Sequence, residues 1–363
     1  RWHLLKTYDK IYTIDLHGNS KKKETAPDGS SDVNVFDIQQ GVSINVFVKT
    51  GKKKENELGK VFHFDLFGKR EFKYDFLNKN SIKSVNFVEL PNKAPDYFML
   101  QKDFELEAEY KSYFSLDEVF NSKVGGVKTH RDNFIIDFDI NDLKNRLSSF
   151  YNLELSNEEL VRSYRLSEKN EWLEQKRQGS LESDFFQKID YRPFDCRSIY
   201  FNPELIDRPR LPLMNNFFHS NIGMIFSRQA TDSNWTAIQV SKFITDNRFH
   251  FSYKGIPVQA PLYLYPETTG QQTIEQSNER KPNLKAEIVH QIAEKLGLTF
   301  TNEKETTENT FAPIDILDYI YAVLHSPTYR EKYKEFLKID FPRVPYPKDQ
   351  DTFWQLVKLG GEI

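Results

Sequence analysis

The stretch Tyr191-Arg192-Pro193-Phe194-Asp195-Cys196-Arg197 and the later stretch Ala260-Pro261-Leu262-Tyr263-Leu264-Tyr265-Pro266 are the most informative parts of this chain. The residues between them are rich in Arg, Asn and aromatic side chains. Residues 191–260 contain eight Lys or Arg against five Asp or Glu, which gives a local charge of +3. Arginine makes bidentate contacts with phosphate and with guanine in the major groove. The composition therefore predicts a surface suited to DNA.

The composition of the whole chain limits the other possibilities. A length of 363 residues predicts roughly two or three domains, and 30 Phe with 18 Tyr supply apolar surface for a sizeable core. No apolar run approaches the roughly 20 residues that span a bilayer, so we expect no transmembrane helix. A single cysteine, Cys196, excludes an internal disulfide and a cysteine zinc cage, which fits a cytoplasmic protein. Because the net charge is −3, binding to nucleic acid requires a local basic face.

Periodicity gives a coarse picture of the secondary structure. We expect strands at residues 11–16, 42–48, 61–67 and 134–140, with further short strands from about 198 to 265. Ser156 and Glu159 form a capping-box pattern, and helices are expected at residues 168–178, 284–296, 315–325 and 326–337. The polar segment 267–282 reads as a loop or linker. Five aromatic residues at helical spacing predict core packing, namely Tyr319, Tyr321, Tyr329, Tyr333 and Phe336.

Three blocks of sequence, in order along the chain, resemble one protein family. The first is residues 8–19 with 34–42, the second is residues 191–266, and the third is residues 318–330 with 340–345. They are similar to the C-terminal part of single-chain restriction–modification N6-adenine DNA methyltransferases of the type ISP and type II-G-like groups. The resemblance implies an α/β and α+β fold, in which the tail end of a Rossmann-like methyltransferase sheet precedes a mixed α/β target-recognition domain with C-terminal helices.

The same resemblance implies a domain order. Residues 1–75 are expected to be the C-terminal strands of the methyltransferase domain, residues 76–150 a connecting segment, and residues 151–363 the target-recognition domain with its C-terminal helices. The family binds S-adenosylmethionine at a glycine-bearing turn and holds the target adenine at an Asn/Asp-Pro-Pro-Tyr/Phe motif. Neither motif occurs in this sequence, and the nearest match, Asn202-Pro203-Glu204-Leu205, reads as a turn. We therefore expect no cofactor and no catalytic residue in this chain, and S-adenosylmethionine only in the intact parent.

The candidate DNA-binding residues are basic and lie in expected loops or near the second block. They are Lys21, Lys22, Lys23, Lys128, Arg131, Arg192, Arg197, Arg208, Arg210, Arg228 and Arg248. For the proline-fixed block at 191–197 we favour a structural interpretation, in which Arg192 or Arg197 pairs with Asp195. Arg208 has the same alternative in Asp207, but for the loop arginines at 208, 210 and 228 we favour DNA. The Gly125-Gly126 pair predicts a turn first and a DNA contact second.

Other kinds of site have weaker support. The eight His show no His-x-His or His-Glu-x-x-His spacing, so a metal site is not expected. Alternation across residues 135–139 places Asp137 and Asp139 on the exposed face of a strand, and no lysine nearby completes a nuclease centre. Cys196 has no evident His and Asn partners and is expected to be a small buried or half-buried residue.

We expect sequence-specific recognition of double-stranded DNA for a bacterial site-specific N6-adenine methyltransferase. The chain starts with Arg1-Trp2 rather than Met, which indicates a fragment that is inactive alone. Its methyltransferase part, and any nuclease or motor part, would precede it on the same polypeptide. Two alternatives stay open: a free-standing DNA-specificity subunit, and a scaffold whose aromatic surface contacts protein.

Overall fold

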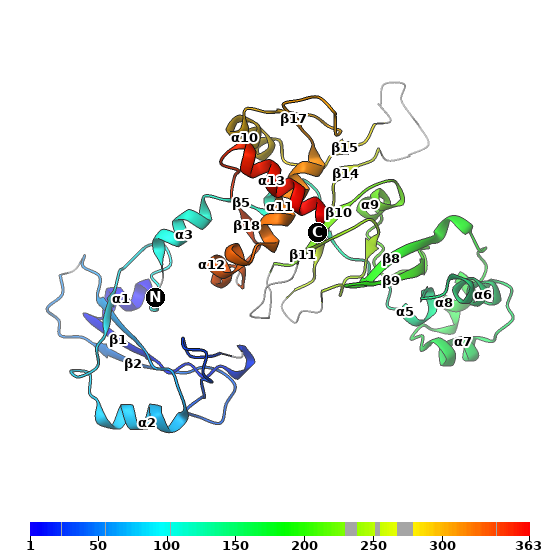
Figure 1. The fold of residues 1–363 in the computed structure, drawn as a ribbon. Coiled ribbons are helices and arrows are strands. Elements are labelled where there is room, and N and C mark those ends of the chain that lie inside the picture. Colours follow the sequence, from blue (N-terminus) through cyan, green and yellow to red (C-terminus); the bar gives the residue numbers. More distant parts are fainter. Residues whose placement is uncertain are drawn as a thin grey trace. The chain divides into compact units, whose positions relative to one another are not determined.

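The computed structural model describes residues 1–22, 24–54, 56–101, 103–228, 238–250, 255–266, 279–338 and 340–363. The chain forms two compact units, Arg1–Ala108 (unit 1) and Glu109–Ile363 (unit 2) (Figure 1). Both contain helices and small sheets, so the fold is a mixed α+β fold, as expected. The boundary between the units falls inside the expected connecting segment 76–150. The three functional domain ranges drawn from the sequence stay predictions.

Unit 1 is built on a four-stranded sheet of order β2-β1-β3-β4. Its strands are β1 (Lys10–Asp15), β2 (Ser43–Val48), β3 (Lys60–Asp65) and β4 (Val88–Leu90). This confirms the three strands predicted for this part of the chain. β1 is parallel to β3 and antiparallel to β2, while β4 is antiparallel to β3. The unit also contains α1 (Trp2–Thr7), the 3₁₀ helix η1 (Ser20–Lys22), α2 (Arg70–Lys79) and the start of α3 (Phe104–Lys111).

Two small apolar clusters hold unit 1 together. One contains Leu5, Ile11, Val61 and Leu90, and the other contains Leu16, Val35 and Leu66. β1 and β3 show the alternation of a sheet with one covered face, because their buried and more exposed residues take turns along the strand. Each strand is followed by Leu and, two residues later, Gly, so the two parallel strands share an Asp-Leu-x-Gly ending. Asp15 and Asp65 stand opposite each other in the register.

Unit 2 has two further four-stranded sheets within its described residues. One has the order β11-β10-β13-β6 and contains β11 (Ile238–Ser241), β10 (Gly223–Phe226), β13 (Val258–Pro261) and β6 (Val124–Gly125). The other has the order β12-β8-β9-β7 and contains β12 (Ile244–Thr245), β8 (Phe186–Arg192), β9 (Asp195–Tyr200) and β7 (Ile136–Asp137). Short two-stranded ladders pair β14 (Tyr263–Leu264) with β15 (Lys281–Pro282), β16 (Thr299–Phe300) with β17 (Thr310–Phe311), and β5 (Phe114–Ser115) with β18 (Arg343–Val344).

Helices pack beside the β8–β9 hairpin in the green part of Figure 1. They are α5 (Asp132–Ile135), α6 (Ile140–Tyr151), α7 (Asn157–Tyr164) and α8 (Asn170–Lys176), and their buried side chains form one core with those of β8 and β9. The predicted capping box at the start of α7 is present, with Ser156 and Glu159 bonded reciprocally. The expected helix at 168–178 is confirmed as α8. Two short helices, α4 (Leu116–Val119) and α9 (Leu211–Met214), and the 3₁₀ helices η2 (Ser183–Phe185) and η3 (Asn215–Phe218) lie elsewhere in the unit.

The predicted strand at residues 134–140 is wrong. Residues up to Ile135 belong to α5, only Ile136 and Asp137 pair as a strand, and Ile140 starts α6. The reason is local, because the Asp139 side chain accepts a hydrogen bond from the Asn141 backbone and caps α6. Asp137 instead pairs with Arg146 of that helix. Asp139 therefore starts a helix, while Asp137 ends the short strand β7 and is held by Arg146 of that helix.

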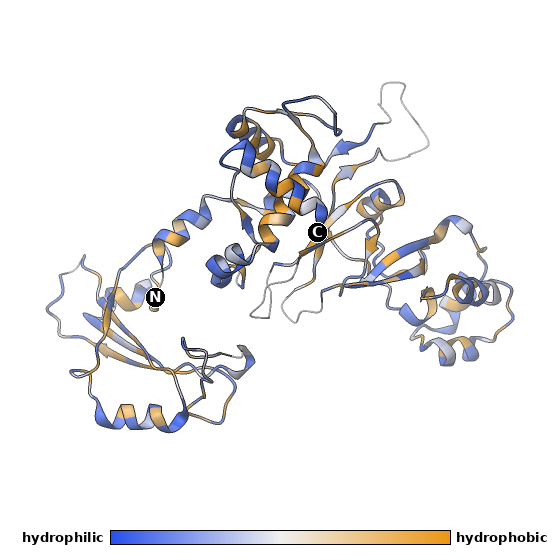
Figure 2. Ribbon diagram, viewed as in Figure 1, coloured by the Kyte–Doolittle hydropathy of each residue, from blue (hydrophilic) through white to orange (hydrophobic). Residues whose placement is uncertain are grey.

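The C-terminal helices confirm the prediction from periodicity. α10 (Ala286–Leu296) ends at Gly297 in the left-handed conformation, and α12 (Pro327–Leu337) starts at Ser326, whose side chain caps it. α11 (Pro313–His325) is almost fully buried and is mostly orange in Figure 2, whereas the outer face of α12 is blue. Four of the five aromatic residues expected in the core are buried, and Phe336 is half-buried against Tyr110.

α13 (Gln350–Glu362) packs closely on α11 at Gly360. A Cβ atom on Gly360 would lie 1.9 Å from the backbone oxygen of Asp318, so glycine is required at this helix crossing.

Within the expected linker 267–282, residues 267–278 lie outside the described residues, and Lys281–Pro282 forms β15. The expectation that Cys196 is buried or half-buried is wrong: the thiol is exposed on β9. Among the helices of the described ranges, none combines the length and the apolar content needed to cross a membrane.

Candidate nucleic-acid interface

The β8–β9 hairpin places the Tyr191–Arg197 stretch at the tip of a two-stranded ribbon. Arg192 and Asp195 are paired, so Pro193 and Phe194 form a two-residue turn. Proline fixes its own φ near −65°, and Phe194 has a φ of +63°. A proline at the first central position of a turn, followed by a positive φ at the second central position, is the pattern of a type II turn. The Phe194 side chain points into solvent and is fully exposed.

Aromatic rings and guanidinium groups stack just below this turn. The guanidinium carbons of Arg192 and Arg197 lie 4.0 and 4.1 Å from the centre of the Tyr191 ring. That of Arg197 also lies 4.1 Å from the centre of the Phe138 ring. The Tyr191 hydroxyl donates a 2.8 Å hydrogen bond to Asp132. Because planar cations stabilise such stacks, the hairpin tip has a fixed base.

Ion pairs explain why both arginines are held. Arg197 donates to both carboxylate oxygens of Asp195, and this contact lowers the pKa of Asp195. This confirms the structural alternative for Arg197. Arg192 instead pairs with Asp246 at 2.6 Å, across 54 positions of sequence. Burial raises the pKa of Asp246, and the opposing effects of the Arg248 backbone amide and of Arg192 do not cancel it. Asp246 is therefore a buried carboxylate that depends on its partners.

Asp246 also joins segments that lie far apart in the sequence. It forms a parallel bridge with Val127, and its carboxylate accepts a 2.8 Å hydrogen bond from the Arg248 backbone. A Cβ atom on Gly126 would lie 2.4 Å from the Asp246 carbonyl oxygen, so glycine permits this approach. Lys128, which follows Val127 in the sequence, forms an antiparallel bridge with Arg208. Residues 126–131, 190–197, 207–210 and 246–248 thus meet, and we call them the four-segment surface.

The four-segment surface contains seven of the predicted basic residues, and three of them are held by close carboxylate partners. Arg131 is inward-facing, since it pairs with Glu168 at 2.7 Å and lies over the Trp172 ring. Arg192 and Arg197 hold the hairpin, as described above. The accessible or half-buried ones are Lys128, Arg208, Arg210 and Arg248.

The accessible basic residues of this surface have few competing partners. Arg208 is more than half exposed, and its contact to Asp207, the predicted structural partner, is long at 3.7 Å. Among the described residues no ion pair involves the side chains of Lys128, Arg210 or Arg248. The buried Nε of Arg210 has no hydrogen-bond partner within the described part of the chain. Arg228 lies outside this surface and pairs with Asp340 at 2.8 Å.

A groove on unit 2 was missed by the sequence argument. Its volume is about 710 Å³, and it is bounded by β8, by the segment that joins β11 to β12, and by residues near β14 and β17. Its lining includes both basic and aromatic side chains: Lys188, His219, Lys242, Arg280, Lys304, Phe186, Phe218, Phe243 and Tyr263. Arg280 and Lys304 are neutralised by Glu303 and Asp315. Lys242 is the one Lys or Arg of this lining that lies within residues 191–260, and no spacing in the sequence links it to the other lysines and arginines.

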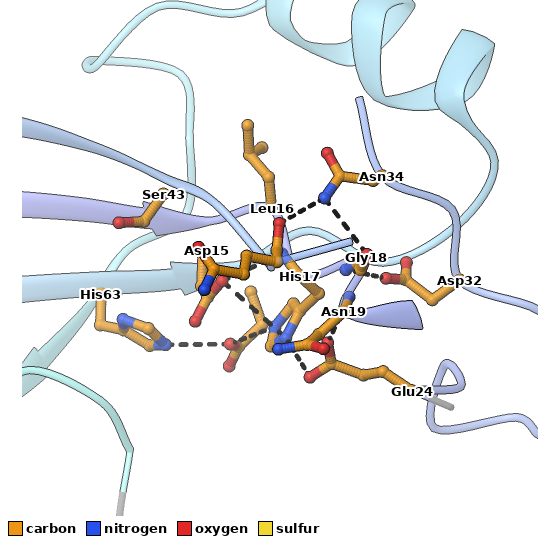
Figure 3. A network of polar contacts seen from close by, with 12 residues as sticks. Asp15, Leu16, His17, Gly18, Asn19, Glu24, Asp32, Asn34, Ser43 and His63 are labelled. Carbon is orange, nitrogen blue, oxygen red and sulfur yellow. Dashed lines mark hydrogen bonds and ion pairs between the residues drawn. The ribbon is translucent and has the colours of Figure 1, made fainter. Parts of the chain in front are cut away.

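In unit 1 the loop after β1 is fixed by a polar network (Figure 3). The ring of His17 contacts Asp65 through Nε2 at 2.8 Å and Glu24 through Nδ1 at 3.1 Å. Burial disfavours its charge, but the carboxylates outweigh burial and raise the pKa of His17. Lys21 follows in this loop and is exposed. For Lys22 only the backbone is described, and Lys23 lies outside the described residues.

The same network contains a group with metal-ligand spacing. Ligand atoms of Asp15, His17 and Asp65 lie within 4.8 Å of one another. No local histidine motif marks this group because its ligands come from two parallel strands. The signal in the sequence is the Asp-Leu-x-Gly ending that the two strands share. Both ring nitrogens of His17 already contact carboxylates, so the cluster is accounted for as an imidazolium held between acids.

Comparisons with known proteins agree with this architecture. Residues 118–363 match the family model of the Type ISP C-terminal specificity domain. No curated protein gives a significant match. Three solved structures each match 99% of this chain. The ATP-dependent Type ISP restriction–modification enzyme LlaBIII bound to DNA has 21% identity and a TM-score of 0.59, and the match covers 24% of that chain. A DrdV–DNA complex has 21% identity, a TM-score of 0.57 and 35% coverage of that chain, and a nuclease-deletion mutant of the Type ISP enzyme LlaGI with a DNA substrate mimic has 20% identity, a TM-score of 0.54 and 27% coverage of that chain.

These likenesses show a shared fold, and the chain spans well under half the length of each of the three solved chains. The family model covers most of the sequence, including the four-segment surface and the C-terminal helices. This chain belongs to the family of Type ISP C-terminal specificity domains.

Proposed function

We propose that this chain recognises a sequence in double-stranded DNA, as the specificity part of a site-specific N6-adenine DNA methyltransferase of a bacterial restriction–modification system. Membership of a specificity-domain family supports the proposal. The observation that carries it is the four-segment surface, where Lys128, Arg208 and Arg248 are brought together on a framework of internal ion pairs. Exposed cations on a rigid base are what phosphate contacts require, because phosphates set position and register on a duplex.

The division of labour among the arginines follows from their contacts. Arg131, Arg192 and Arg197 each have a carboxylate partner, so they shape the surface. Arg208 and Arg248 retain donors for phosphate or for guanine O6 and N7. Lys21 of unit 1 is a further phosphate contact in this proposal. The basic groove near Lys242 provides a second place where a backbone could lie.

We assign methyl transfer to residues outside this chain. The glycine turn after β1 does not carry the cofactor motif of the family, and Gly18 serves the packing of its own loop. A Cβ atom on Gly18 would lie 2.4 Å from the Cα of Asn34, so the loop itself fills that space. The parallel pair β1 and β3, flanked by antiparallel strands, supports the interpretation of unit 1 as the end of a methyltransferase sheet. The target adenine would then be extruded into the preceding part of the parent.

Binding of the chain to labelled duplex DNA at several salt concentrations tests the proposal. We expect an affinity that falls steeply as salt rises, because neutralised phosphates release counterions. Binding to a protein partner with no dependence on salt, and no binding to DNA, would favour the scaffold alternative. A second assay measures transfer of labelled methyl groups to DNA by this chain alone, for which we expect no incorporation.

A further inference from the structure

Phe194 combines two features that each disfavour phenylalanine at its position. Its ring is fully exposed, so it gains nothing from burial within this chain. Its φ of +63° belongs to the left-handed region, and the second position of a type II turn favours Gly or Asn. Backbone strain of this kind concentrates at functional sites, where the surrounding structure enforces it. The conformation therefore calls for an explanation outside the hairpin.

The hairpin fixes the backbone from which this ring projects into solvent. Pro193 fixes the first turn position, and the pairing of Arg192 with Asp195 closes the ribbon directly beneath the ring. Below that, the arginine and tyrosine stack and the contacts to Asp195 and Asp246 anchor both strands. A projecting apolar group on a rigid base is suited to insertion, because little conformational entropy is lost when it is enclosed.

The surroundings of the ring fit DNA better than protein. The same four-segment surface presents Lys128, Arg208 and Arg248, whose positive charge complements phosphate. Two other members of the surface, His130 and Arg210, also have positive φ, so the unusual backbone is concentrated here. Proteins that deform duplex DNA insert apolar side chains, phenylalanine among them, between base steps while cations hold the flanking phosphates.

Leu153 is an informative contrast within unit 2. It too is exposed and has a positive φ, of +60°. It lies just after α6, however, where a left-handed residue is a usual way to end a helix. The adjacent charged residue is Glu154, an acid. Local structure therefore accounts for Leu153 and does not account for Phe194.

We propose that Phe194 is a wedge whose ring stacks on the bases of duplex DNA at one step of the bound site. This inference rests on the proposed function and deepens it, because it names the residue that deforms the duplex. Every base offers a π face, so the contact is tolerant of sequence. Phe194 then sets the local bend, and the neighbouring polar groups contact the base edges that distinguish one sequence from another.

The test uses the 363-residue chain and a pool of randomised duplexes with a donor and an acceptor dye at their two ends. The variants are Phe194→Ala, Phe194→Leu and Phe194→Asn, with Leu153→Asn as the matched control. We expect Phe194→Ala and Phe194→Asn to weaken binding by about 10- to 100-fold and to abolish the change in energy transfer that reports bending. Phe194→Leu retains much of both, because aliphatic side chains also act as wedges.

Two readouts separate the wedge from a structural role and from a phosphate contact. Phe194→Asn should unfold at the same temperature as the parent or higher, because Asn tolerates the left-handed conformation. The dependence of affinity on salt should be unchanged in the Phe194 variants, because the ring neutralises no phosphate. Leu153→Asn should leave affinity and energy transfer as in the parent.

The outcomes distinguish the two proposals. If the parent binds DNA and Phe194→Ala matches it in affinity and energy transfer, the wedge is overturned and the proposed function stands. If Phe194→Ala still binds DNA but no longer associates with a methyltransferase part, the ring contacts protein. That result also overturns the wedge. If the parent binds no DNA at any salt, the proposed function fails and the wedge fails with it.

Discussion

Replacing Arg192 with methionine isolates the part of the hairpin that depends on a buried charge. Methionine keeps much of the side-chain length and can still contact Tyr191, but it removes the partner of Asp246. The carboxylate of Asp246 is only 5% exposed, and within the described residues its remaining hydrogen-bond donor is the backbone amide of Arg248. The variant therefore tests whether Arg192 supports the surface or is available to DNA.

The size of the effect follows from burial. Removing one partner from a fully buried ion pair typically costs about 3–5 kcal/mol of the free energy of unfolding. Arg192 is 32% exposed, so water can solvate part of the vacated space. The remaining amide contact reduces the cost further. We therefore expect Arg192→Met to lower the free energy of unfolding by about 2 kcal/mol at neutral pH.

The effect should depend on pH in a defined direction. The pKa of Asp246 is already raised by burial, and loss of Arg192 raises it further. Well below pH 4, both the folded and the unfolded chain carry a protonated Asp246, so no buried charge is stranded. As the pH rises through the ordinary aspartate range, the unfolded chain ionises first. The destabilisation by Arg192→Met must therefore grow as pH rises from about 4 to 7.

Urea unfolding followed by circular dichroism, at pH values from about 4 to 7, measures this difference. Arg208→Met is the matched control, because its contact to Asp207 is long and exposed and should change stability by less than about 0.5 kcal/mol. A loss of less than about 0.5 kcal/mol in Arg192→Met at neutral pH, or a loss that does not change with pH, would show that Asp246 does not depend on Arg192.

Three further predictions follow from other parts of the structure. Gly360→Ala should lower the free energy of unfolding by about 1–3 kcal/mol because the new Cβ meets the backbone of α11, whereas Gly255→Ala, with open space around it, should change little in the same urea assay. Burial lowers the pKa of His250 to about 4, so as pH falls from about 6.5 to 4 the unfolded chain takes up the proton first and stability declines; NMR titration showing an ordinary histidine pKa would contradict this. Arg248→Ala should reduce the slope of log affinity against log salt by roughly one, measured by anisotropy, and an unchanged slope would remove it from the phosphate contacts.

Local patterns allowed much of the fold to be predicted. The strands of unit 1 and the helices near the C-terminus have long, regular periodicity, and Ser156, Gly297 and Ser326 mark helix ends by their own chemistry. The failed strand at 134–140 shows where such reasoning stops. Alternation over a few residues was outweighed by one capping contact of Asp139, which committed the following residues to a helix.

The candidate site was predicted less well, because its contacts join distant parts of the chain. Composition identified the basic residues, and the pairing of Arg197 with Asp195 followed from their closeness in sequence. The pairing of Arg192 with Asp246 had no local signal, and neither had the bridge between Lys128 and Arg208. Which cations are used internally and which remain accessible was settled only by tertiary packing.

We propose that this chain recognises a DNA sequence. Selection from a randomised duplex library with the purified chain, repeated at low and high salt, measures this recognition. We predict enrichment of one short motif, with an affinity that falls as salt rises. Salt-dependent binding without any enriched motif would contradict recognition by this chain alone and assign specificity to its combination with the methyltransferase part. No binding at any salt would contradict the account as a whole.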